Sequence, residues 1–253
     1  MSRIYEAMRR AHQEAQPPSA LERDDGIPEV PRTNGLPESV RVAFERLAQE
    51  IASSITTDEL RTIIVVSAVQ GEGTSTVARG LATILGQTEP TLLVDANLRT
   101  PTQHVAFGRD RGPGLSDVAS EKVALKEAIR EHVAPGLDLL CSGAAGGGPA
   151  LSTEALPQIK RYIGTQKFRD DALSLPCRYR WAIVDMPPVT VFADALNWAS
   201  NADGAIIVLR AEHTRWEVAT KAKQILDSYG IRILGAVLNR RKYHIPDSVY
   251  KLL

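Results

Sequence analysis

The stretch TIIVVSAVQGEGTSTVARGLA, residues 62–82, decides the fold. It opens with a mainly β-branched run, residues 62–67, which is typical of a parallel strand buried on both faces. Gly71 and Gly73 follow, and apolar residues at helical spacing come after them. Glycines between a strand and a helix allow backbone N–H groups to surround a phosphate at the positive end of the helix dipole. The stretch predicts a phosphate-binding loop, although an ordinary glycine turn capped by Ser75 would give the same pattern.

Five more strand-like apolar runs occur along the chain, at residues 91–95, 137–141, 181–185, 204–209 and 233–239. Helical spacing separates or precedes these runs, at residues 39–55, 75–87, 152–165 and 214–228. Strands that alternate with helices form right-handed βαβ units around one sheet. We therefore expect an α/β fold with a doubly wound, mostly parallel sheet and helices on both faces.

The first 37 residues differ in character from the rest of the chain. Residues 2–15 have the spacing of a short amphipathic helix, which is either a frayed terminus or a docking helix for a partner. Residues 16–37 are rich in Pro, Gly and charge, a composition that cannot build a core. We expect a flexible extension over 1–37 and one nucleotide-binding domain over 38–253.

Composition excludes several classes of protein. Thirty basic residues balance 30 acidic ones, so no overall positive field favours nucleic acid. The apolar runs are far shorter than the ~20 residues of a membrane span, and the N-terminus lacks a signal-peptide core. Cys141 and Cys177 have no CxxC or histidine partners, so we expect reduced, mostly buried thiols. These features predict a cytoplasmic protein that does not bind nucleic acid.

Two acidic residues follow core strands. Asp95 ends the run 91–95, and Asp185 ends the run 181–185. The carboxyl ends of parallel strands meet at one edge of a sheet, which is the edge where the glycine loop also lies. Two carboxylates that face a phosphate loop require a bridging cation. A magnesium nucleotide is therefore the simplest ligand for this edge of the sheet.

Five segments in order resemble the bacterial tyrosine kinases, the cytoplasmic autokinases that pair with membrane polysaccharide co-polymerases and are related to the deviant Walker ATPases. The segments are SAVQGEGTSTVARGLA, LLVDANLRTP, GPGLSDV, AIVDMPPV and GAVLNRRKY, within a resemblance that covers residues 38–245. The resemblance implies a P-loop fold that binds ATP or ADP with Mg²⁺. It also implies that the partner is the cytoplasmic segment of a co-polymerase, and that this partner holds the protein at the inner membrane. A homo-oligomer is compatible with the resemblance.

The resemblance assigns roles to individual residues. The phosphates would contact the loop residues Gln70, Gly71, Glu72, Gly73, Thr74, Ser75 and Thr76. Ser75, Asp95 and Asp185 would surround the metal. Both aspartates would be catalytic, Asp185 as the Walker B carboxylate and Asp95 beside the acceptor tyrosine as a general base. Asn239 and Arg240 would lie near the adenine, and Tyr243 and Tyr250 are the candidate phosphoacceptors.

The sequence departs from the family pattern at several positions. Thr74 replaces the loop lysine, and the loss of such a charge commonly costs ~3 kcal/mol in the barrier, or ~100-fold in rate. Asn97 replaces the second acid of the family's DxD word. Val42, Glu45 and Ala48 stand where the family has a glutamate and two arginines, so ring formation through that motif is not expected.

Three functions fit these features. The first, which we favour, is a kinase-like protein that binds nucleotide and regulates exopolysaccharide or capsule assembly, with weak or absent phosphoryl transfer. The second is an active autokinase in which another cation replaces the lysine, from Arg99, from Arg79 or from a partner. Arg79 itself is interpreted as a solvated helix residue. The third is a nucleotide-free scaffold.

Overall fold

The computed structural model describes residues 37–55, 60–143, 179–191, 196 and 202–241. All of them belong to one compact unit of the chain. Several expectations fall outside these residues: the helices at 2–15 and 152–165, the extension over 1–37 except for its last residue, Cys177, Tyr243 and Tyr250. The division into an extension and one domain therefore stays a prediction.

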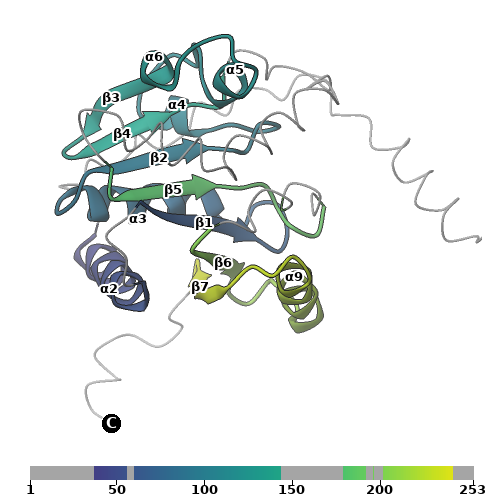
Figure 1. Cartoon of the computed structure of the whole chain (residues 1–253). Helices are drawn as coiled ribbons and strands as arrows, with labels where there is room; N and C mark the ends of the chain where they lie inside the picture. Colours follow the sequence, from purple (N-terminus) through teal and green to yellow (C-terminus); the bar gives the residue numbers. More distant parts are fainter. Residues whose placement is uncertain (1–36, 56–59, 144–178, 192–195, 197–201, 242–253) are drawn as a thin grey trace, which may run out of the picture. The chain divides into compact units, whose positions relative to one another are not determined.

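Seven strands of the described chain form one sheet in the order β3-β4-β2-β5-β1-β6-β7 (Figure 1). They are β1 (Arg61–Ser67), β2 (Thr91–Asp95), β3 (Ile129–Ala134), β4 (Leu137–Leu140), β5 (Trp181–Asp185), β6 (Gly204–Arg210) and β7 (Ile233–Asn239). Every neighbouring pair is parallel except β3 and β4. This arrangement confirms the mostly parallel sheet, and the six strands expected from the sequence are all present.

The described helices are α2 (Glu38–Ser54), α3 (Thr74–Gly86), α4 (Gln103–Ala106), α5 (Leu115–Ala119), α6 (Leu125–Ala128) and α9 (Trp216–Ser228). The long helices α2, α3 and α9 confirm those expected over 39–55, 75–87 and 214–228. The short helices α4 to α6 have at most five residues each, too few for a periodic pattern to show in the sequence. None of the helices described is long and apolar enough to cross a membrane.

Helices cover both faces of the sheet. In β1, Ile64 and Val66 belong to one apolar core, while Ile63 and Val65 belong to the other, because successive side chains of a strand point to opposite faces. The first core includes apolar residues of α5, α6 and α9, and the second includes those of α2 and α3. The sheet is thus buried on both sides, which confirms the doubly wound α/β fold.

Strand β3 is the one element of the described sheet that the sequence analysis missed. It lies at the edge of the described sheet and, among the described strands, pairs only with β4, in antiparallel orientation. Its sequence, IREHVA, is polar in the middle, and its register shifts between Arg130 and Ala134. Within that shift His132 has a φ of 54°, and its N–H donates to Asp138 Oδ1 at 2.7 Å. An irregular edge strand of this kind carries neither an apolar run nor a strict alternation.

Candidate nucleotide-binding site

The loop between β1 and α3 has the geometry of an anion site. Gly71 and Gly73 have φ values of 86° and 94°, in the left-handed region that favours glycine. Gly73 is also the N-cap of α3, and no side-chain cap bond is made there. The first N–H groups of a helix have no acceptor within the helix, so those of α3 are available to a ligand. No side chain of the described residues caps this helix start, Ser75 included, and phosphate binding by the loop stays a prediction.

The Glu72 carboxylate stabilises this loop from within. The side chain is buried, and its Oε2 accepts the N–H groups of Ala68 and Val69 at 2.7 and 3.0 Å. Its Oε1 accepts the hydroxyl of Thr214, just before α9. Both carboxylate oxygens are thus engaged in holding the loop, which the sequence pattern did not indicate.

The end of β7 lies against the same loop. The Asn239 side chain donates from Nδ2 to the carbonyl oxygen of Glu72 at 2.8 Å. A Cβ atom at Gly73 would collide with this carboxamide, so Gly73 is required by the close approach as well as by its φ. Arg240 follows with a φ of 57° and an exposed side chain. The structure therefore brings the two residues predicted near the adenine to the rim of the loop.

Asp185, at the carboxyl end of β5, has one oxygen without a partner. Its side chain is fully buried, and Oδ2 accepts Gln103 Nε2 at 2.7 Å. Burial raises the pKa of Asp185 to about 6, although the nearby side chains of Ser75 and Gln103 and the charge of Arg79 lower it. Its Oδ1, by contrast, is buried and accepts no hydrogen bond from the residues described. A buried oxygen left without a donor costs about 1–3 kcal/mol, a cost that a cation would remove.

Asp95 lies directly beside Asp185 on the neighbouring strand. The two residues are register partners between β2 and β5. Asp95 Oδ1 accepts the N–H of Asn97 at 3.2 Å, and Oδ2 accepts those of Thr102 and Gln103, each at 3.1 Å. Burial and the charge of Asp185 raise the pKa of Asp95 to about 8, against the effect of these three bonds. The carboxylate pair thus meets at the loop edge of the sheet, as predicted.

Gln103 joins these groups, and the sequence analysis missed it. Its buried carboxamide donates from Nε2 to Asp185 and to the Ser75 carbonyl oxygen, the latter at 3.0 Å. Its Oε1 accepts from Arg79 Nη1 at 3.1 Å. A glutamine at the start of a four-residue helix gives no pattern in sequence that would identify it.

Arg79 corrects one interpretation of the sequence. It was expected to be a solvated helix residue, but it is partly buried and contacts Gln103. Residues four apart lie on the same face of a helix, so Arg79 lies one turn beyond Ser75 on the face directed at Asp185. The four-residue spacing from Ser75 is the feature of the sequence that indicates this inward position.

Two of the departures from the family pattern lie near this site. Thr74 is the first residue of α3, and its side chain is buried, so no cation occupies the lysine position. Asn97 Oδ1 accepts the N–H and hydroxyl of Thr100, which closes a local turn. Within the described residues, no group of three or more His, Cys, Asp or Glu could hold a metal. A nucleotide-bound Mg²⁺ needs only a few protein ligands, because phosphate oxygens and water supply its other ligands.

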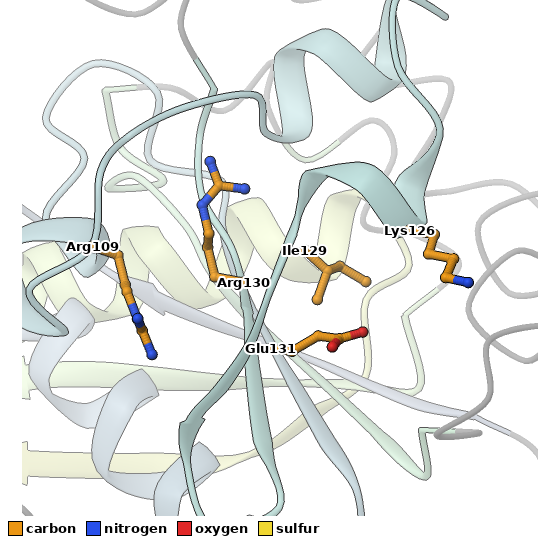
Figure 2. Close-up of a pocket in the computed structure, with 5 residues that line it drawn as sticks. All are labelled: Arg109, Lys126, Ile129, Arg130 and Glu131. Atoms are coloured by element: carbon orange, nitrogen blue, oxygen red, sulfur yellow. The ribbon is translucent and has the colours of Figure 1, made fainter.

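A separate pocket of about 390 Å³ lies beside β3 and is lined by Arg109, Lys126, Ile129, Arg130 and Glu131 (Figure 2). Its charged groups do not converge. Figure 2 shows the Arg109 and Arg130 side chains pointing in different directions, and Arg130 Nε pairs with Asp110 at 3.0 Å. Glu131 adds a negative charge to the lining. The pocket therefore lacks the focused charge that would bind an anion.

Comparison with known proteins agrees with this geometry. No protein-family model matches the sequence. The chain is similar to the tyrosine-protein kinase YwqD of Bacillus subtilis, with 32% identity over 185 residues, which are 73% of this chain and 74% of YwqD. It is also similar to the solved VpsO kinase domain, at 28% identity and a TM-score of 0.67, over 81% of this chain and 95% of that domain.

A more distant structural neighbour is the septum site-determining protein MinD of Pyrococcus horikoshii, solved as a complex with Mg-ADP. It shares 23% identity and has a TM-score of 0.57 over 77% of each chain. At this identity the likeness shows the fold alone. The described sheet and loop therefore form a P-loop α/β fold.

Proposed function

The chain belongs to the bacterial tyrosine-kinase family, and on that premise we propose that it binds ATP or ADP with Mg²⁺ and regulates exopolysaccharide or capsule assembly. One observation carries the nucleotide part of the proposal. The uncapped N-terminus of α3 opens beside a buried Asp185 oxygen that has no donor in the described part of the chain. An anion and a cation together fit these two groups, and a magnesium nucleotide supplies both.

The residues present fit a metal at this place. Asp185 Oδ1 and the Ser75 hydroxyl would hold Mg²⁺, which in turn would neutralise charge on the phosphates. The backbone N–H groups of residues 70–76 would surround the phosphates, while Asn239 and Arg240 would flank the base. Asp95 would stand behind Asp185 as the second catalytic carboxylate, near the acceptor hydroxyl. Its raised pKa is suited to a group that takes up a proton.

Phosphoryl transfer by this site would be weak or absent, because Thr74 supplies no charge where negative charge gathers in the transition state. One observation favours the alternative of an active autokinase: the partly buried Arg79 brings a guanidinium to the Asp185 side of the site. A nucleotide-free scaffold is less well supported. In such a protein no bound cation would offset the free-energy cost of burying the Asp185 oxygen that lacks a donor among the described residues. Tyr243 and Tyr250 would be the phosphoacceptors of the active form.

A membrane polysaccharide co-polymerase is the proposed partner, through its cytoplasmic segment. This places the protein in the cytoplasm, at the inner membrane through that partner. The proposal rests on the five family segments that the sequence carries in order. A homo-oligomer is compatible with it, although Val42, Glu45 and Ala48 in α2 do not provide the family's usual motif.

Calorimetric titration of the full chain with ADP, with and without MgCl₂, tests nucleotide binding. We expect saturable binding that magnesium strengthens. If ADP produces neither heat nor a shift in melting temperature, the nucleotide-free scaffold is the remaining function. Incubation with radiolabelled ATP and magnesium then tests transfer. A label that is lost in the Tyr243→Phe, Tyr250→Phe double variant would identify an active autokinase, and no label above background would support the regulatory form.

A further inference from the structure

We propose that Gln103 is the positioning residue that presents Asp185 to the divalent cation. The inference rests on the proposed nucleotide function and goes beyond it, because neither the family segments nor the loop pattern includes this glutamine. Gln103 touches neither phosphate nor metal in this scheme. It acts through Asp185, whose orientation it determines.

The hydrogen bonds of the Gln103 carboxamide are complete. The side-chain nitrogen has two N–H groups, and they reach Asp185 Oδ2 at 2.7 Å and the Ser75 carbonyl oxygen at 3.0 Å. The side-chain oxygen accepts from Arg79 at 3.1 Å. Gln103 is fully buried, so water does not compete for these bonds. Such a satisfied buried amide is rigid.

Only one orientation of the carboxamide is compatible with its neighbours. Asp185 and the Ser75 carbonyl are acceptors, so they require the nitrogen, whereas Arg79 can only donate and requires the oxygen. Gln103 therefore engages one oxygen of Asp185, which is Oδ2 in this structure. The consequence is that Oδ1 is left open, and this is the buried oxygen that lacks a donor in the described chain.

The backbone of Gln103 is held in turn by Asp95. One carboxylate oxygen of Asp95 accepts the N–H groups of Thr102 and Gln103, both at 3.1 Å, which ties the start of α4 to the end of β2. The two acidic strand ends are thus linked through one glutamine. Groups behind a metal ligand that fix its orientation commonly contribute about 10–100-fold to metal affinity.

The test is the substitution Gln103→Met, which keeps the length of the side chain and removes its polar atoms. The full chain is titrated with ADP in EDTA and with ADP in MgCl₂. We expect affinity in EDTA to change little, while the strengthening by magnesium falls about 10–100-fold. Gln224→Met is the matched control, because Gln224 is an exposed residue of α9 away from the loop, and it should leave both affinities unchanged.

A double-variant cycle distinguishes positioning from a general structural effect. If Gln103 acts through Asp185, Gln103→Met should cause no further loss of the magnesium effect in an Asp185→Asn background. Gln103→Asn, whose shorter side chain cannot reach both acceptors, is a second variant for the case in which the methionine does not fold, and it should show the same loss. Circular dichroism without nucleotide checks the folding of each.

The outcomes separate this inference from the proposed function. If the unsubstituted chain binds no ADP under either condition, the proposed function and the inference are both overturned. If that chain responds to magnesium and the folded Gln103 variants respond equally, only the inference is overturned. Equal losses in the Asp185→Asn and unsubstituted backgrounds would also overturn it, because the glutamine would then act independently of Asp185.

Discussion

The two ends of the parallel strands differ in how their charged side chains are paired. At the amino end, Glu89 accepts Trp181 Nε1 at 2.6 Å and Arg61 Nη1 at 3.1 Å, while the Arg61 guanidinium lies 4.7 Å from the centre of the Trp181 ring. At the carboxyl end, Asp185 keeps an oxygen with no donor in the described chain, beside the buried Asp95. The paired Glu89 at the amino end is typical of a structural interaction. The open oxygen of Asp185 at the carboxyl end is typical of a ligand-binding site.

The largest effect that would sharpen this contrast comes from Asp185→Asn. Removal of the charge should weaken magnesium-dependent nucleotide binding by about 100-fold or more, since the cation loses its carboxylate. The metal-free protein should melt at the same or a higher temperature, because a buried charge has been removed. Calorimetry and thermal melting of the same sample check both. A variant that melts much lower would show that Asp185 is structural.

Thr74→Lys addresses the gap in the loop. A lysine at this position restores a charge beside the phosphates, so transfer from ATP should rise by up to ~100-fold, or nucleotide binding should tighten. Radiolabel transfer and ADP titration measure the two effects. Gln87→Lys, at the exposed C-terminal end of the same helix, is the control for charge alone. If Thr74→Lys changes neither transfer nor ADP affinity, the proposed contact between residue 74 and the phosphates is wrong.

Glu89→Ala tests the opposite end of the strands. The change leaves Trp181 Nε1 and Arg61 without their shared acceptor, so it should lower the free energy of unfolding by about 1–3 kcal/mol. Nucleotide affinity should stay the same, because Glu89 precedes β2 and the loop is at the far end of the sheet. Urea denaturation gives the first quantity and ADP titration the second. A loss of affinity without loss of stability would break the comparison.

Stability should also change with pH. Burial raises the pKa values of Asp95 and Asp185 to about 8 and about 6, above the ordinary 3.8. For carboxyls whose folded pKa is raised, the native state binds more protons, so metal-free stability is full below pH ~4 and falls as the pH rises towards 8. Each group contributes at most ~1.4 kcal/mol per pH unit. Thermal melting across this window should show the slope, and Asp95→Asn should flatten it.

The parts that the sequence predicted well are those in which local pattern and tertiary burial agree. The runs at 91–95 and 181–185 became β2 and β5 with those bounds, because strands buried on both faces must be apolar throughout. Cys141 is buried and free, as expected, and burial raises the pKa of its thiol to about 11. Asp95 and Asp185 met because strand ends in a parallel sheet share one edge.

The parts that were missed depend on contacts between distant segments. Gln103 lies 28 residues from Ser75 and 82 from Asp185 in the chain, so no spacing connects them. A charged helix residue usually lies in solvent, but the buried amide of Gln103 and the charge of Asp185 make the inward position of Arg79 favourable. Glu72 was assigned to phosphate by its place in the motif, but its side chain supports the loop.

The bond between Asn239 and Glu72 has a consequence for how the protein matures. These residues are 167 positions apart, and β7 is the outermost of the described strands on its side of the sheet. During synthesis, the loop emerges from the ribosome long before the residue that braces it. A nascent chain shorter than 239 residues therefore lacks this brace, so premature stops upstream of β7 should yield products that capture nucleotide poorly.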